Sequence, residues 1–69
     1  MKLSGRNKLK GTVKSVELSG VMARVIIDIG GGNEVTSIIT SESANELGLE
    51  TGRAVTALIK ATSVMVMDS

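Results

Sequence analysis

The sequence TSESANELGLETG, residues 40–52, interrupts a chain that otherwise alternates apolar and polar residues as strands do. Ser43 and Glu46 have the spacing of a capping box, in which the two side chains bond backbone N–H groups in the first turn of a helix. Gly48 follows Leu47 and suits the position just past a helix, where glycine is favoured. This stretch predicts one short helix at residues 43–47 and a turn at residues 50–52.

Strand-like alternation precedes this helix in three segments. The first begins at Leu9, and its inward parity changes near Lys14 and Ser15, which predicts a β-bulge. The second is apolar on one face and half apolar on the other, which suggests that both faces are covered, one of them by a partner subunit. Turn sequences rich in glycine separate the segments. The predicted strands are residues 9–18, 21–29 and 34–40.

Two further strands are predicted after the helix, at residues 53–61 and 63–67. The resulting order is β-β-β-α-β-β, an all-β chain with one short helix. Five strands with a helix between the third and the fourth predict an OB-fold, a five-stranded Greek-key barrel. A bulge in the first strand suits this fold, because that strand must bend to serve both halves of the barrel. An SH3-like barrel is the main alternative, but it has no helix at that place.

The composition indicates a single domain, residues 1–69, that needs partners. A chain of 69 residues has a marginal core, and small domains usually add disulfides, a metal or oligomerisation. The chain has no Cys and no His, which excludes disulfides and common soft-metal sites. Since 42% of its residues are hydrophobic, oligomerisation is the expected support.

Several classes of function fit the composition poorly. With no His or Cys to act as base or nucleophile, we expect no enzyme activity and no cofactor. OB-folds that bind single-stranded nucleic acid use aromatic platforms in a basic groove, whereas this chain has no aromatic residue and a net charge of +1. The start of the chain lacks the apolar core of a signal peptide, and no apolar run has transmembrane length. We therefore expect a cytoplasmic protein with neither nucleic-acid nor membrane partners.

Hydrogen-bond donors gather in three short segments. Each pairs a hydroxyl or a cation with backbone N–H groups, and together they could surround a tetrahedral oxyanion, provided that Glu42 points away. In the second segment the backbone at the start of a helix favours an anion. The alternative is that these residues are caps and turns, with Thr40 and Ser43 capping the helix. The first, second and third donor segments are Ser4-Gly5-Arg6-Asn7, Thr40-Ser41-Glu42-Ser43 and Lys60-Ala61-Thr62-Ser63.

The stretches SGRNKLKGTV, IITSESANELGLETG and VTALIKAT, in this order and spacing, resemble the molbindins. These are the small Mop-type molybdate-binding proteins, built from the same module as the transport-associated OB domains. The resemblance covers residues 4–62. It implies an OB-fold protein that assembles as a hexamer, a trimer of dimers. It further implies that molybdate, and usually tungstate, binds between subunits and is stored or buffered in the cytoplasm.

The resemblance also implies a role for each site residue. On one subunit, Ser4 would donate its hydroxyl, Gly5 its backbone N–H and Arg6 its guanidinium. Lys60 would bring a second cation, followed by the N–H of Ala61.

The neighbouring subunit would contribute Thr40 and Ser43. Ala61 departs from relatives that carry a hydroxyl at this position, and Thr62 is the candidate to replace it. A pocket made of donors would disfavour phosphate, whose proton needs an acceptor, at a cost of about 1–3 kcal/mol. Sulfate could be rejected only by size. The alternatives to molybdate binding are a nucleic-acid-binding OB module and a structural or regulatory OB subunit without a ligand.

Overall fold

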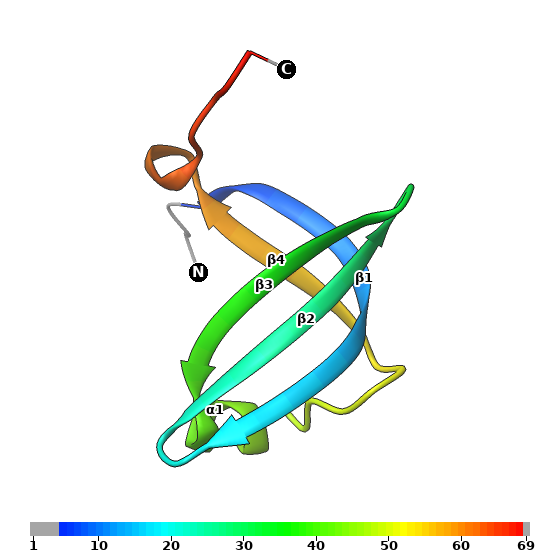
Figure 1. The fold of residues 1–69 in the computed structure, drawn as a ribbon, viewed down its shortest axis with the longest axis vertical. Coiled ribbons are helices and arrows are strands. Elements are labelled where there is room, and N and C mark those ends of the chain that lie inside the picture. The colour runs from blue at the N-terminus through cyan, green and yellow to red at the C-terminus, as the bar shows by residue number, and fades with distance from the viewer. Residues whose placement is uncertain (1–4, 69) are drawn as a thin grey trace.

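The computed structural model describes residues 5–68, with the side chains of residues 7–68. Its four strands form one antiparallel sheet in the order β3-β2-β1-β4. The sheet curls into an open barrel with α1 at one end and η1 at the other (Figure 1). Among the described residues, no helix is both long enough and apolar enough to cross a bilayer. The elements are β1 (Gly5–Ser19), β2 (Met22–Gly30), β3 (Asn33–Thr40), α1 (Ser41–Glu46), β4 (Ala54–Lys60) and the 3-10 turn η1 (Ala61–Ser63).

The long strand β1 joins the two halves of the barrel. Its first half pairs with β4 and its second half with β2, and the register with β2 shifts between Val13 and Ser15. The predicted bulge is therefore confirmed. An extra residue at this point bends the strand, so that one strand serves both halves of the sheet.

The core lies on the concave face of the curled sheet. Val13 and Val25 are each 1% exposed, and they form a cluster with Ile27 and Ala57. Alternate residues of β2 point inward, as the sequence predicts, because successive side chains of a strand lie on opposite faces. The predicted strand at residues 21–29 also placed Val21 on this inward face, and that prediction is wrong. Val21 lies in the turn before β2 and is 78% exposed.

The helix begins earlier than predicted. α1 starts at Ser41, and the N-cap is Thr40, whose hydroxyl accepts from the Ser43 N–H at 3.0 Å. The expected start at Ser43 is therefore wrong, because its N–H is already bonded to the cap. The other end agrees with the sequence: Leu47 is the C-cap and Gly48 has a φ of +64°.

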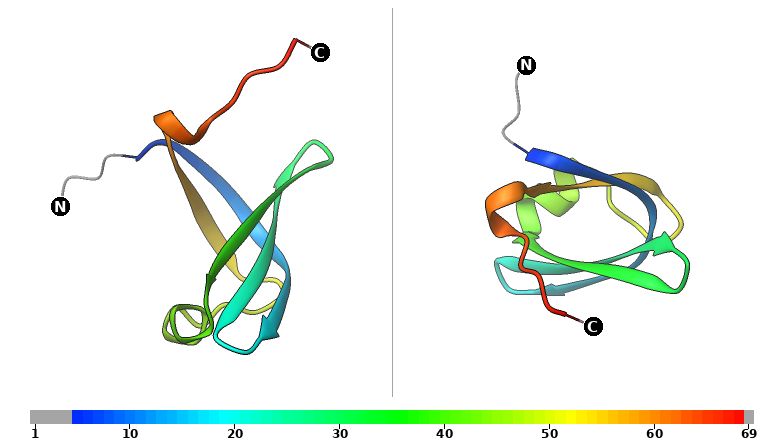
Figure 2. Two further views of the ribbon diagram at one scale, coloured as in Figure 1. Left: turned by 60° about the vertical axis from the view of Figure 1, so that its left-hand side comes forward. Right: turned by 90° about the horizontal axis from the view of Figure 1, so that it is seen from above.

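The predicted fifth strand at residues 63–67 is wrong. The chain forms η1 after β4, with the Val64 N–H bonded to the Ala61 carbonyl at 3.3 Å, and then runs away from the barrel. Figure 2 shows this 64–68 segment projecting from the sheet. Four successive apolar side chains are exposed on it: Val64 by 49%, Met65 by 92%, Val66 by 92% and Met67 by 85%.

The missing strand leaves an apolar groove on the barrel. Because β3 and β4 are the two edges of the sheet, the concave face stays open between them. This groove has a volume of about 830 Å³. We call it the edge groove, and apolar side chains dominate its lining, among them Val35, Ile39, Leu49, Val55, Ala57 and Ile59. Apart from the fifth strand, the predicted OB-type class is confirmed: an all-β barrel with one short helix.

Candidate functional site

The first and third donor segments meet at one end of the barrel. Gly5 pairs with Lys60 where β1 and β4 end, and the register shifts between Gly5 and Asn7. The Asn7 amide donates to the Ile59 carbonyl at 3.3 Å, which ties the two strands together beside this pair. Ser4 lies outside the described residues, and so does the side chain of Arg6. We call the end of the barrel where β1 begins and β4 ends the η1 end.

The third donor segment turns sharply at the η1 end. Lys60 is extended, with φ −62° and ψ 139°, and it occupies the position before η1. Ala61 and Thr62 lie within η1, and all three residues are exposed. One cation and the backbone of a helical turn are therefore presented to solvent next to the start of β1. This is a suitable arrangement for receiving an anion.

The second donor segment contains a coupled pair of hydroxyls. Thr40 Oγ1 accepts from the Ser43 N–H at 3.0 Å and lies 2.8 Å from Ser43 Oγ. The two hydroxyls carry two protons, and the bond between them uses one. Only one proton is left to donate to a ligand while the cap is intact. The capping alternative is thus confirmed for Thr40, and the pair keeps one hydroxyl proton that neither of these two bonds uses.

Ser41 fixes this pair to the turn between β1 and β2. Its N–H donates to the Val21 carbonyl at 2.8 Å. Its hydroxyl lies 2.9 Å from the Gly20 carbonyl and 3.0 Å from the Met22 carbonyl. The sequence placed Ser41 in a donor segment but gave no sign of this role, because the turn lies about 20 residues away along the chain.

The second donor segment lies at the opposite end of the barrel from the other two. Thr40 pairs with Met22, and Met22 pairs with Ser19 at the far end of β1 from Gly5. β1 is 15 residues long, and a strand rises about 3.3 Å per residue. Figure 1 shows α1 and η1 at opposite ends, and we call the former the α1 end. A small oxyanion cannot touch both ends of one chain.

Two ion pairs lie outside the donor segments. Lys14 pairs with Glu34, and this hydrogen bond raises the pKa of Lys14. Arg24 donates to Glu17 at 2.7 Å, which raises the pKa of Arg24. Both pairs are exposed and contribute little to stability. Over residues 5–68, no cluster of three His, Cys, Asp or Glu side chains could hold a metal ion.

Comparison with protein families matches residues 3–66 to the TOBE domain. A probable molybdenum-pterin-binding protein of Haemophilus influenzae is 54% identical over 66 residues, which is 96% of each chain.

Two solved structures show the same fold. A molybdate-binding protein from Sporomusa ovata superimposes with a TM-score of 0.90 at 46% identity, covering 99% of this chain and 100% of that one. The cytoplasmic molybdate-binding protein ModG, with molybdate bound, gives a TM-score of 0.88 at 46% identity, covering 94% of this chain and 46% of that chain.

Proposed function

The chain belongs to the TOBE domain family, and from this premise we propose that it binds molybdate, or alternatively tungstate, as a binding protein rather than an enzyme. The observation that carries the proposal is the set of donor segments found in a chain so similar to molybdate-binding proteins. Such a protein stores or buffers the oxyanion, and the cytoplasm is the proposed location, as for ModG.

The proposed pocket lies between two chains. The η1 end of one copy supplies Ser4, Gly5, Arg6, Lys60 and Ala61, with Thr62 as the candidate for a further donor. The α1 end of another supplies Thr40 and Ser43. The opposite placement of Gly5 and Thr40 supports this division, because the two ends of one chain are too far apart to share an anion.

A pocket that presents hydrogen-bond donors and no carboxylate would distinguish anions by whether they carry a proton. Molybdate is a proton-free dianion at neutral pH, whereas phosphate keeps at least one proton. In a pocket without a carboxylate only a hydroxyl oxygen can accept that proton, which displaces a donor from the anion, and a mismatch of this kind costs about 1–3 kcal/mol. Glu42 is exposed and must point away from the anion for this selection to operate.

Molybdate is expected to raise the melting temperature of the protein more than phosphate does. A ligand that binds only the folded state adds about 2.7 kcal/mol of stability at one hundred times its Kd. For a domain of this size each kcal/mol corresponds to roughly 4–8 °C. Differential scanning fluorimetry with molybdate, tungstate, sulfate and phosphate at equal concentration measures the effect. Equal stabilisation by all four would indicate a general salt effect and contradict a shaped pocket.

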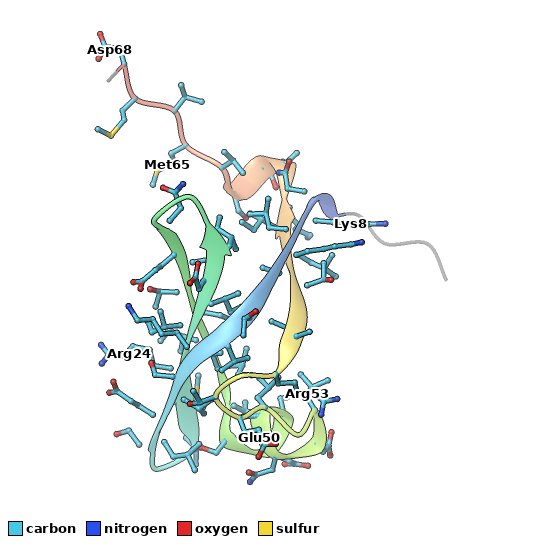
Figure 3. All side chains as sticks on the ribbon, turned by 90° about the vertical axis from the view of Figure 1, so that its right-hand side faces the viewer. Lys8, Arg24, Glu50, Arg53, Met65 and Asp68 are labelled. Atoms are coloured by element: carbon cyan, nitrogen blue, oxygen red, sulfur yellow. The ribbon has the colours of Figure 1, made fainter. Side chains whose placement is uncertain are left out.

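We further propose that the chain is a homo-oligomer, and the resemblance to the molbindins suggests a hexamer. Two apolar surfaces that the single chain leaves uncovered support association: the edge groove and the exposed apolar residues 64–67. Figure 3 shows Met65 and Asp68 on the segment that extends beyond the barrel. A second copy that places its own residues 64–67 along β3 or β4 would cover both surfaces and pair a free sheet edge.

Val66→Asp is expected to convert the assembly to smaller species. Burying an unpaired carboxylate in the apolar edge groove costs several kcal/mol, whereas the exposed position in the isolated chain tolerates it. Sedimentation velocity at micromolar concentration reports the change. Asp68→Asn, a polar change two residues further on, serves as the control and should sediment like the parent. Parent-like sedimentation of Val66→Asp would show that residue 66 lies outside the interface.

A further inference from the structure

The hydrogen bonds of Ser41 differ from those of the other hydroxyl residues in the second donor segment. Its backbone N–H and its side chain both reach the β1–β2 turn, at the carbonyls of Val21, Gly20 and Met22 over 2.8–3.0 Å. A serine hydroxyl carries one proton, so the two carbonyl oxygens of Gly20 and Met22 share it. Ser41 therefore has no proton left for a ligand.

The hydrogen bonds of Ser41 affect the proposed pocket because Ser41 lies between Thr40 and Ser43, the two residues proposed to bind the anion. Thr40 precedes it, Ser43 follows two residues later, and those two hydroxyls are already locked to each other. Thr40 is also held by its pairing with Met22 at the end of β3, whereas the position of Ser43 depends on how the start of α1 is held. The bonds of Ser41 join the start of α1 to the turn between the end of β1 and the start of β2.

The two carbonyl oxygens matter electrostatically as well. They carry partial negative charge and face the start of α1, where they lie within 3.0 Å of the Ser41 hydroxyl. A dianion at this end of the barrel would be repelled by uncovered carbonyl oxygens. The Ser41 proton reduces that repulsion, because it is shared between the two carbonyl oxygens and offsets part of their negative charge.

We propose that Ser41 is a positioning residue of the anion pocket, which holds the Thr40–Ser43 hydroxyl pair on the β1–β2 turn and covers the Gly20 and Met22 carbonyls. This role rests on the proposed molybdate function. It assigns the specificity of the pocket partly to a side chain that does not touch the anion.

Isothermal titration calorimetry of the full chain with molybdate tests the proposal. Ser41→Ala is expected to weaken binding about tenfold, since the loss of one hydrogen bond changes an equilibrium by up to that amount. Ser41→Thr keeps the hydroxyl and should restore most of the affinity. Thr51→Val is the matched control: it removes the bond from Thr51 to the Lys14 carbonyl (3.4 Å), outside the donor segments, and should bind like the parent.

The ratio of molybdate to sulfate affinity separates positioning from a general loss of stability. Partial unfolding lowers the concentration of competent protein for both anions equally, whereas a displaced hydroxyl pair changes the ratio. A lower ratio in Ser41→Ala that Ser41→Thr restores supports the role. Parent-like binding by Ser41→Ala, or equal weakening by both variants, overturns it. Absence of molybdate binding by the parent would instead overturn the proposed function itself.

Discussion

Gly11→Ala is expected to remove a large part of the stability of the barrel. A Cβ at this position would lie 2.4 Å from the Asp28 carbonyl oxygen and 2.9 Å from Ile27 Cγ2. The carbonyl belongs to the backbone of β2, whose Asp28 pairs with Thr12, so it cannot retreat without opening the ladder. Such overpacking costs about 3 kcal/mol. A domain of this length has roughly 3–10 kcal/mol in total.

Thermal unfolding followed by far-ultraviolet circular dichroism measures this loss, which should lower the melting temperature by more than 10 °C. Lys10→Ala is the control, because it changes the adjacent residue of β1 at an exposed position. Its melting temperature should stay near that of the parent. A parent-like value for Gly11→Ala would mean that β1 and β2 can separate at this point at little cost.

Local patterns predicted the parts of the fold that depend on local physics. The alternation of Ala23, Val25 and Ile27 identified the inward face of β2, because side-chain direction in a strand follows from backbone geometry alone. The change of parity near Lys14 located the bulge for the same reason. Gly48 marked the end of α1, since its φ of +64° disfavours other residues.

The fifth strand could not be predicted correctly because a strand is defined by its partner. Residues 63–67 have the apolar composition of a strand, and such a composition favours burial against a partner. It does not say which sheet edge they meet. In the isolated chain they meet none, and Met65 and Val66 stay 92% exposed.

The start of α1 shows a second limit. Thr40 and Ser43 are both good N-cap residues, so the sequence alone does not choose between them. The choice is made by tertiary contacts, since Ser41 is bonded to the β1–β2 turn and α1 therefore begins directly after β3.

The candidate site could be proposed from the sequence as a set of residues but not as an arrangement. Donor chemistry singled out three segments, and pairing of Gly5 with Lys60 brings two of them together. The sequence could not show that Thr40 lies at the other end of the barrel, because that depends on the register of β1, β2 and β3. This separation is the feature that makes a shared site between chains the consistent proposal.

Lys60→Ala and Arg6→Ala are each expected to weaken molybdate binding by about one to two orders of magnitude. Each removes a charge-assisted hydrogen bond worth roughly 1.5–3 kcal/mol. Arg6→Lys should recover only part of the loss, because an ammonium group cannot reproduce the planar fork of a guanidinium. The fold should survive Lys60→Ala, since Lys60 is exposed at the end of β4.

Calorimetric titration of these variants, with sedimentation to verify that each assembles like the parent, decides whether the η1 end binds the anion. Lys10→Ala is the matched control, because Lys10 is an exposed cation of β1 that pairs with Thr56 and lies outside the donor segments. If overall positive charge alone attracted the dianion, Lys10→Ala would weaken binding as much as Lys60→Ala. A loss confined to Arg6 and Lys60 would place both charges within about 10 Å of the anion, because screening leaves an exposed charge little effect beyond that distance at ordinary ionic strength. Parent-like affinity in both alanine variants would remove the η1 end from the site and leave the α1 end without its counter-charge.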